Sequence, residues 1–573
     1  MGGIRTYSLL FRRFFLNLDD RLRLILIALV VGCFGGVASC ALNETLDMVA
    51  HWVRDFRSCW YGPFLPGVGA ALSFVFLRYI AKEGKGHGVP EVIYSITRRG
   101  GLLRFRSSYT RLVSCLFTIA SGGSAGPEAP VVISGGALGS NIASFFHLKE
   151  RQRSVLVGCG ASAAIAAIFN APMAGIAFTL ETILGEWSQV NLIPIATASV
   201  AGTEVSRLLH GDQIPFQSRV LHFEAKDLLA CALLALFTAA MAVVLIRSLR
   251  LVERRSSRFH RLPGWAIALA GGILVGIIGI WMPFALGEGY EPTRLAIGNL
   301  FPEGLAFVAF ALVAKVVSTS LTLGTGGSGG LFAPCLGVGA LTGLSFHRVL
   351  TQVLPREMWP EGGFFSLLGM AGVMSSVLQA PMTGIFLIVE ITGGYDLLVP
   401  VVLVAVLSAT LSQFFEPHSV YHQELLERGE LLRPRTDARI LADLEIWELL
   451  ERDFHKVSPE MTLKEFRKVL QRSRRDLFPV VENHTGNYLG SLALDEVRPY
   501  IFSSGFYDQL LVEEVMDREY PTASPEEELG EILERMNEKD VATVPVVMDG
   551  KVLGLLSKAT ILDHYRWELM VQE

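Results

Sequence analysis

The sequence predicts an all-α polytopic membrane protein with an internally duplicated transmembrane domain, followed by a soluble α+β domain. Three observations predict this fold class. Of the 573 residues, 51% are hydrophobic and only 18% are charged, whereas a soluble protein carries nearer a quarter charged residues. The uncharged stretches end near residue 415, where a more polar composition begins. Two separated blocks within the apolar part also occur twice.

Uncharged stretches recur through the apolar part. A helix needs about 20 apolar residues to cross about 30 Å of hydrocarbon. Several stretches approach this length, and others are shorter or interrupted by glycine or proline; they lie at residues 24–37, 67–76, 228–246, 266–280, 305–314, 364–389 and 399–412. Arginines flank several of them, at residues 12–13, 98–99, 104–106 and 247–261. Positive flanks favour the cytoplasm, so we expect a cytoplasmic N-terminus in a bacterial-type inner or plasma membrane, and no nucleic-acid partner.

The duplication is visible in two blocks of the apolar part. The run GSAGPEAP at 123–130 matches GSGGLFAP at 327–334, and NAPMAGI at 170–176 matches QAPMTGI at 379–385. In each copy of the second block, a glutamate follows eleven residues after the first residue: Glu181 after Asn170, and Glu390 after Gln379. Transporters often contain such repeats in inverted topology, with the substrate site where the halves meet. The sequence therefore predicts a duplicated, and by class an inverted, membrane domain.

The polar part contains a second, smaller repeat. The strand pattern FPVV…YLG at 478–490 matches VPVV…VLG at 544–554, with a tight turn at Asp549-Gly550 and an amphipathic helix before each copy, near 463–471 and 529–537. Each copy is too small for a core of its own, so the two should pack together. We expect a membrane domain at residues 1–430, a linker at 431–440, and a soluble pair at 441–573 divided near residue 510.

Glycine-rich turns are the candidate substrate sites. They lie at 84–90, 122–126 and 326–330, and the last two are related by the duplication. Glycine lets successive backbone N–H groups converge, and a helix that begins there adds its positive dipole end. An anion held in this way can also leave, which suits transport. Close helix packing by small residues is the alternative.

Glu128 lies two residues after the second of these turns. A carboxylate within a membrane is costly and usually functional. Held by backbone amides at a helix start, it would compete with a permeant anion, and protonation would release it. The alternative is a helix-capping glutamate. Glu181 and Glu390, which end the two repeat copies, occupy equivalent places, and we expect them to bond backbone amides near helix ends.

The sequence resembles the CLC family of chloride channels and proton-coupled anion exchangers, followed by a pair of CBS motifs. Three signature loops carry the resemblance: GHGVP at 86–90 (the first loop), GPEAP at 126–130 (the second loop) and GLFAP at 330–334 (the third loop). The segments 170–172 and 417–421 also fit. The likeness extends over nearly the whole chain from about Asp20.

The resemblance implies a homodimer in the lipid bilayer with one pore per subunit, and it implies chloride as the substrate. Glu128 would be the external gating residue. The backbone amides of Leu331 and Phe332 would bind the central anion, and the Tyr421 hydroxyl would close its inner side. The implied anion-binding positions are His87, Gly126, Gly330, Leu331, Phe332 and Tyr421.

Three features depart from the family pattern. His87 replaces a serine of the first loop, and an imidazole that titrates near neutral pH could make transport pH-sensitive. Pro127 and Ala129 replace the Arg and Gly that usually flank the gating glutamate. Thr182 stands where proton-coupled members place an inner glutamate, so the proton relay is uncertain.

These departures favour a pH- or voltage-gated chloride channel with Glu128 as its gate. Proton-coupled chloride exchange, or the same fold selective for fluoride or nitrate, is the alternative. A CBS-linked cation transporter would need more carboxylates along the pore. An enzyme is not expected, because no metal-binding cluster, nucleophile–base pair or phosphate loop is visible.

The CBS pair resembles modules that bind adenine nucleotides. The ribose contact usually requires Ser or Thr followed three residues later by Asp. The first copy has Ala493 and Glu496 at these positions, and the second has Ser557 and Thr560. Neither is complete, so a structural role and an adenine nucleotide at this site both remain as interpretations.

Overall fold

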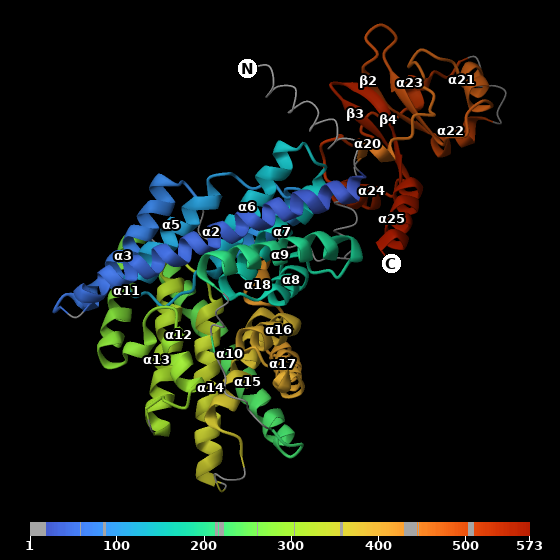
Figure 1. Cartoon of the computed structure of the whole chain (residues 1–573). Coiled ribbons are helices and arrows are strands. Elements are labelled where there is room, and N and C mark those ends of the chain that lie inside the picture. Colours follow the sequence, from blue (N-terminus) through green and yellow to red (C-terminus); the bar gives the residue numbers. More distant parts are fainter. Residues whose placement is uncertain are drawn as a thin grey trace, which may run out of the picture. The chain divides into compact units, whose positions relative to one another are not determined.

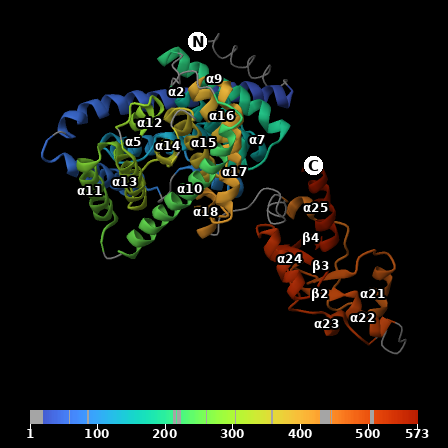
Figure 2. The same ribbon diagram turned by 90° about the horizontal axis from the view of Figure 1, so that it is seen from below.

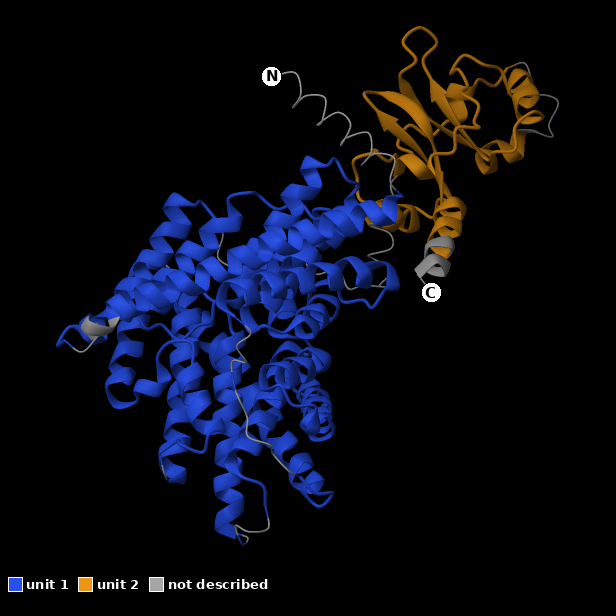
Figure 3. Cartoon of the chain, viewed as in Figure 1, with its two compact units in different colours: residues 1–431 blue, residues 432–573 orange. Residues whose placement is uncertain are grey.

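The computed structural model describes residues 19–57, 59–83, 88–211, 216, 223–259, 262–302, 304–353, 355, 359–428, 444, 446–501 and 509–572. The chain forms two compact units, residues 1–431 and 432–573, which are coloured separately in Figure 3. The expected linker at 431–440 lies outside the described residues.

The first unit is built of helices: α2 (Asp20–Arg57), α3 (Leu65–Val75), α4 (Val89–Arg98), α5 (Ser107–Ala120), α6 (Glu128–Phe145), α7 (Glu150–Phe169), α8 (Pro172–Phe178), α9 (Gln189–His210), α10 (Asp227–Arg258), α11 (Gly264–Trp281), α12 (Tyr290–Ile297), α13 (Leu305–Gly324), α14 (Phe332–Val353), α15 (Gly362–Leu378), α16 (Pro381–Thr392), α17 (Leu398–Gln413) and α18 (Val420–Glu427). Within the described residues, seven helical segments are long and apolar enough to cross a membrane. Six contain predicted apolar stretches. The seventh, α7, did not stand out in the sequence because alanine, serine and glycine fill much of it.

The apolar stretch at 364–389 is two helices rather than one. Gln379 has a left-handed backbone (φ 52°), and Pro381 begins α16 two residues later. Asn170 (φ 53°) and Pro172 divide α7 from α8 in the same way. Proline cannot continue a helix, because it lacks the N–H and collides with the preceding turn. Both halves therefore contain a long helix followed by a short one.

Small residues allow the helices of each half to approach closely. A Cβ added to Gly135 would lie 2.1 Å from the carbonyl oxygen of Gly160, so only glycine fits where α6 crosses α7. The equivalent crossing of α14 and α15 has the same limit, because a Cβ on Gly339 would lie 2.5 Å from the Gly369 oxygen. In Figure 1, α2 runs across α6, α7 and α9, which it contacts. The turned view in Figure 2 has α10, α15 and α17 side by side, as their contacts require.

The second unit contains two similar halves. The first has α21 (Leu463–Leu470), the antiparallel hairpin of β1 (Leu477–Val481) and β2 (Tyr488–Ala493), α22 (Leu494–Ile501) and α23 (Val512–Val515). The second has α24 (Leu529–Glu538), the hairpin of β3 (Thr543–Met548) and β4 (Lys551–Ser557), and α25 (Lys558–Gln572); α20 (Ile446–Leu449) precedes both. The predicted helices are confirmed. The turn at Asp549 and Gly550 is also confirmed, with φ angles of 51° and 74°.

Candidate functional site

The second and third loops meet at the centre of the first unit. Gly126 N–H donates to the Gly330 carbonyl (2.8 Å) and Gly330 N–H donates to the Gly126 carbonyl (2.7 Å), forming an isolated antiparallel bridge. The flanking contacts are reciprocal too. Ser124 N–H donates to Thr322 Oγ1 (3.0 Å), and Ser328 N–H donates to Thr118 Oγ1 (3.1 Å). The chain runs in opposite directions through the two loops, as an inverted repeat requires.

Glu128 is the first residue of α6, and its side chain folds back onto this bridge. The residue is 1% exposed. A Cβ on Gly126 would lie 2.0 Å from Glu128 Oε2, and a Cβ on Gly330 would lie 3.4 Å from it. The two glycines therefore leave the space that one carboxylate oxygen fills. Glu128 Oε1 accepts a hydrogen bond from the Tyr290 hydroxyl (2.8 Å). Glu128 Oε2 has no hydrogen-bond partner in the part of the chain that the structure describes.

The third loop leads directly into α14. Leu331 and Phe332 are buried, and the Phe332 ring stacks on Phe169 at 5.2 Å between centroids and meets the edge of Phe178 at 5.9 Å. These aromatic contacts fix the start of α14. N–H groups in the first turn of a helix have no intrahelical acceptor. Two helices, α6 and α14, thus begin on either side of the glycine bridge with donors available for an anion.

Tyr421 is buried on α18. Ser419 caps the start of this helix, and its Oγ accepts the N–H of His422 (3.3 Å). The Tyr421 hydroxyl lies within electrostatic range of Glu128 and of Cys335 on α14. The structure therefore brings Tyr421 to the same interior as the second and third loops.

The first loop is described only in part, and His87 lies outside the described residues. Glu83 is the last described residue before this loop, and three side chains of α5 bind its carboxylate. The Glu83 carboxylate accepts hydrogen bonds from Ser107 Oγ (3.0 Å) and Thr110 Oγ1 (2.7 Å), and Arg111 Nε forms an ion pair with it at 3.0 Å. On the other side of the loop, a Cβ on Gly88 would lie 2.9 Å from the carbonyl oxygen of Ala129. The first loop therefore ends against the second.

Glu181 and Glu390 bond backbone amides, as predicted. Glu181 accepts hydrogen bonds from the N–H groups of Met382 (3.1 Å) and Thr383 (2.9 Å) at the start of α16. Glu390 accepts those of Met173 (2.9 Å) and Ala174 (2.8 Å) at the start of α8. Each carboxylate satisfies donors that the helix start leaves free.

Thr182, next to Glu181, is buried. Its Oγ1 has no hydrogen-bond partner among the described residues. It lies in a π-helical turn, Thr179–Leu184, that continues α8. The threonine hydroxyl does not ionise at physiological pH, so this position offers no titratable group.

The sequence did not single out Tyr290 or Lys315. Tyr290 is the first residue of α12 and contacts Glu128 across 162 positions of sequence. Lys315, in the middle of α13, is completely buried. The signal available for Lys315 was a charged residue inside an apolar stretch. No local pattern distinguished Tyr290 from other tyrosines at helix ends.

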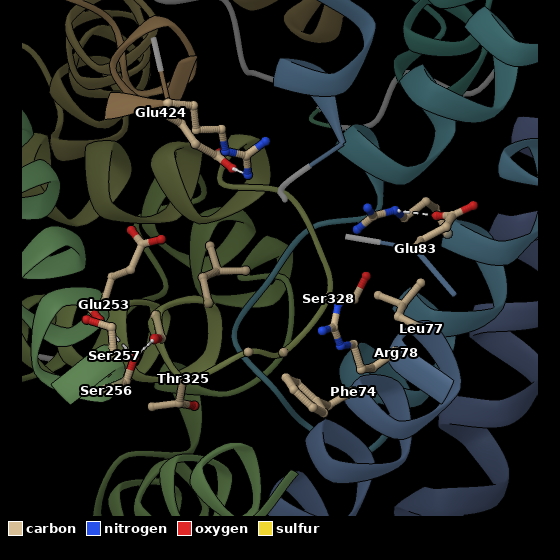
Figure 4. A pocket seen from close by; sticks show the side chains of 16 residues that line it. Phe74, Leu77, Arg78, Glu83, Glu253, Ser256, Ser257, Thr325, Ser328 and Glu424 are labelled. Carbon is tan, nitrogen blue, oxygen red and sulfur yellow. Dashed lines mark hydrogen bonds and ion pairs between the residues drawn. The ribbon is translucent and has the colours of Figure 1, made fainter. Parts of the chain in front are cut away.

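A cavity of about 210 Å³ opens beside the third loop (Figure 4). Its lining includes the turn at residues 324–328, Arg78 after α3, and Glu424 and Arg428 around the end of α18, the helix that carries Tyr421. Glu83, the last described residue before the first loop, and Arg111 also line it. The cavity thus borders the glycine turn that precedes the third loop and the end of α18.

In the second unit, the hydroxyl groups of Ser557 and Thr560 form hydrogen bonds within the chain. Both hydroxyl groups donate to Glu451 Oε1, Ser557 at 2.6 Å. Arg475 forms an ion pair with the other oxygen of Glu451. Glu451 is brought there by backbone pairing with β4, because its N–H donates to the Leu555 carbonyl (2.9 Å) and its carbonyl accepts the Leu555 N–H (3.0 Å). The position that the CBS resemblance implies for a ribose contact thus holds a carboxylate of the chain itself.

Comparisons with known proteins identify the family of each unit. Residues 68–413 match the model of a family described as voltage gated chloride channel, and residues 446–503 and 512–566 each match the CBS domain. Curated relatives include the H(+)/Cl(-) exchange transporter ClcA of Salmonella paratyphi A, which is 28% identical over 422 residues covering 70% of this chain and 87% of the relative. The transporter of the same name from Vibrio cholerae is 27% identical over 419 residues, covering 70% and 88%.

Solved structures share the fold. A slow cyanobacterial Cl-/H+ antiporter has a TM-score of 0.65 at 21% identity, covering 72% of this chain and 99% of the other. A eukaryotic CLC transporter has a TM-score of 0.62 at 17% identity, covering 94% of this chain and 98% of the other. A CLC-type fluoride/proton antiporter has a TM-score of 0.60 at 22% identity, covering 70% and 97%. The family model matches more than half of the chain, and the protein therefore belongs to the CLC family of anion transport proteins, as a multi-pass membrane protein with a C-terminal CBS pair.

Proposed function

We propose that this protein exchanges chloride for protons across the membrane, with Glu128 carrying out the step that couples them. The observation that supports the proposal most strongly is the position of Glu128. Its carboxylate lies against the bridge between the second and third loops, where two helix starts provide donors for an anion. Relatives that align with most of the chain are named H(+)/Cl(-) exchange transporters, so the exchanger reading fits them better than the channel reading favoured from the sequence.

The proposed cycle uses the competition between a carboxylate and chloride. The charged Glu128 side chain fills the space beside Gly126 and Gly330, and it excludes an anion because both bear negative charge. Protonation removes that charge, so the side chain leaves and chloride takes its place near the amides of Leu331 and Phe332. The hydroxyl of Tyr421 and the first loop with His87 would complete the path toward the cytoplasm. Backbone dipoles hold the anion weakly enough for it to leave again.

The proposal extends to assembly and orientation. We infer a homodimer with one pathway in each subunit, and a cytoplasmic location for the N-terminus and the CBS pair. The arginine-rich end of α10 supports this orientation, because it has Arg255 and Arg258 in its last turn. Cross-linking in native membranes and cysteine labelling from either side test the two inferences.

A passive chloride channel is the second candidate, and Thr182 favours it. Exchange needs a route for protons from the cytoplasm, and the buried Thr182 cannot relay them by titrating. If the protein exchanges chloride for protons, ordered water must carry the protons past Thr182.

The experiment that separates the candidates uses proteoliposomes with an outward chloride gradient and no pH gradient. A silver chloride electrode and a pH electrode follow the external medium together. Exchange predicts that chloride leaving the vesicles drives protons inward against their electrochemical gradient. A channel predicts chloride efflux with no uphill proton movement. Vesicles loaded with fluoride or nitrate in place of chloride, followed with electrodes selective for those ions, test the alternative substrates.

A further inference from the structure

Tyr290 contacts the gating carboxylate from the opposite half of the membrane unit. Its hydroxyl donates a hydrogen bond of 2.8 Å to Glu128 Oε1, while Oε2 lies beside Gly126. The two carboxylate oxygens thus have different environments: one is bonded to a phenol and the other lies against the glycine bridge. Neither Glu128 nor Tyr290 can move without breaking this bond.

The segment before Tyr290 is held in place by a buried lysine. Gly287 and Gly289 have left-handed backbones, with φ angles of 63° and 102°, and form a tight loop. Lys315 Nζ donates to the Gly287 carbonyl at 2.8 Å and reaches the Ala285 carbonyl at 3.5 Å. A buried ammonium needs such oxygens to offset its lost hydration. Lys315 therefore fixes the loop that presents Tyr290.

Further contacts join this loop to the second loop and orient the phenol ring. Gly287 N–H donates to the carbonyl of Gly122 (3.2 Å), in the glycine turn that leads to Glu128. Thr293 Oγ1 donates to the Gly289 carbonyl (2.7 Å), and the ring of Phe216 meets that of Tyr290 edge-on at 6.0 Å. The loop before Tyr290 and the Phe216 ring together orient the Tyr290 hydroxyl toward Glu128.

A hydrogen bond from a neutral hydroxyl is stronger when its acceptor is a carboxylate than when the acceptor is a neutral acid. The Tyr290 bond therefore stabilises the charged, inward-folded form of Glu128 more than the protonated form. Protonation weakens the bond at the same moment that it removes the charge. Both changes favour release of the side chain.

Other titratable groups also surround Glu128. Those that interact with it electrostatically are Cys115 on α5, Cys335 on α14, Tyr421 on α18, and Glu288 on the loop before α12, and Glu288 in turn interacts with Lys315. His87 in the first loop lies outside the described residues. Because Glu288 carries its carboxylate close to the gate, a test of Tyr290 must keep Glu288 unchanged.

We propose that Tyr290 is the latch of this transporter: a positioning residue whose hydroxyl holds Glu128 closed and sets the pH at which the gate opens. The inference rests on the proposed role of Glu128 and adds a second residue to it. Lys315 supports the latch by fixing the loop from Ala285 to Gly289.

The test is the pH dependence of chloride flux in proteoliposomes for Tyr290→Phe, which keeps the ring and removes the hydroxyl. Loss of the bond should move the pH of half-maximal flux upward by about one unit, since a hydrogen bond to a charged group has about that effect on protonation. Flux at the acid plateau should stay at the wild-type level. Tyr109→Phe, at an exposed ring on α5, should leave the midpoint unchanged. An unchanged midpoint in Tyr290→Phe would overturn the latch.

Two further measurements test the latch if Tyr290→Phe folds poorly. They also distinguish failure of the latch from failure of the proposed gate at Glu128. Fluorotyrosine at position 290, in which a ring fluorine replaces a hydrogen, keeps the hydroxyl and makes it a stronger donor, and it should lower the midpoint; an unchanged or raised midpoint contradicts the latch. Adding Tyr290→Phe to Glu128→Gln should have no effect on the pH profile, and any shift there would show that Tyr290 acts elsewhere. If Glu128→Gln keeps its own pH dependence, the proposed gate fails; if only Tyr290→Phe lacks an effect, the latch alone fails.

Discussion

Glu181 and Glu390 each cap a helix start in the other half of the membrane unit. Glu181 bonds the amides that open α16, and Glu390 bonds those that open α8, at distances of 2.8 to 3.1 Å. These capping contacts are reciprocal, like the hydrogen bonds between Gly126 and Gly330. The two halves are therefore held together by matching polar contacts as well as by packed helices.

Removing the charge of either carboxylate should weaken this connection. In Glu181→Gln and in Glu390→Gln, a charge-assisted acceptor becomes a neutral one, at a cost of about 1–3 kcal/mol. We expect both variants to unfold at a lower temperature in detergent, by similar amounts. Asp20→Asn, at an exposed ion pair on α2 with Arg23, is the matched control and should unfold at the wild-type temperature. A drop in only one of the two variants would contradict the symmetric role.

Gly126 should tolerate no side chain. A Cβ there would lie 2.0 Å from Glu128 Oε2, so Gly126→Ala displaces the carboxylate from the glycine bridge. We expect chloride flux at neutral pH, at which the proposed gate keeps Glu128 on the bridge, to rise toward its acid value. The measurement is vesicle efflux at pH 7.5 and pH 4.5. Gly394→Ala, where no atom lies within 4 Å of the added Cβ, should behave as wild type. If chloride flux through Gly126→Ala stays low at neutral pH, the Glu128 carboxylate of the closed state does not lie against the glycine bridge.

Arg78 should assist entry of anions. It lines the cavity beside the third loop, and Figure 4 has it on the same side as Ser328. Among the described residues, Arg111 and Arg428 in this lining are paired with Glu83 and Glu424, whereas Arg78 forms no ion pair. Arg78→Ala should lower chloride flux several-fold at low ionic strength and little at high salt, because salt screens the attraction. Arg78→Lys keeps the charge and should retain the flux. A loss that does not depend on salt would indicate a structural role.

Adenine nucleotides should not bind the CBS pair at Ser557. Both Ser557 and Thr560 donate to Glu451, which Arg475 also holds. We expect AMP, ADP and ATP to leave the melting temperature of the full chain unchanged. Glu451→Ala frees the two hydroxyl groups, and the same nucleotides should then raise its melting temperature. Glu448→Ala, at the exposed face of α20, is the control. Stabilisation of the wild-type chain by any of the three nucleotides would show that Glu451 does not block the position.

The sequence predicted the parts of the site that occur twice. The two glycine loops and the pair Glu181 and Glu390 were visible because duplication repeats both residue type and spacing. Glu128 was visible because a carboxylate in an apolar segment is costly. These signals are local, and the structure brings the predicted residues of the second and third loops together.

The contacts that depend on tertiary pairing could not be predicted. Tyr290 meets Glu128 only because the loop at 285–289 folds over Lys315, and no spacing in the chain encodes that approach. Glu451 reaches Ser557 only through its pairing with β4. The division of the stretch at 364–389 had a local signal, Pro381, but the apolar run on both sides of it suggested a continuous segment.

The central claim is that protonation of Glu128 couples anion and proton movement. Its most direct test is simultaneous recording of chloride and proton fluxes from vesicles that contain Glu128→Gln, whose side chain resembles the protonated acid. We predict that chloride flux persists and becomes independent of pH, and that proton flux falls to the level of protein-free vesicles. Proton transport that continues in this variant, or chloride flux that keeps the pH dependence of the wild type, would contradict the account.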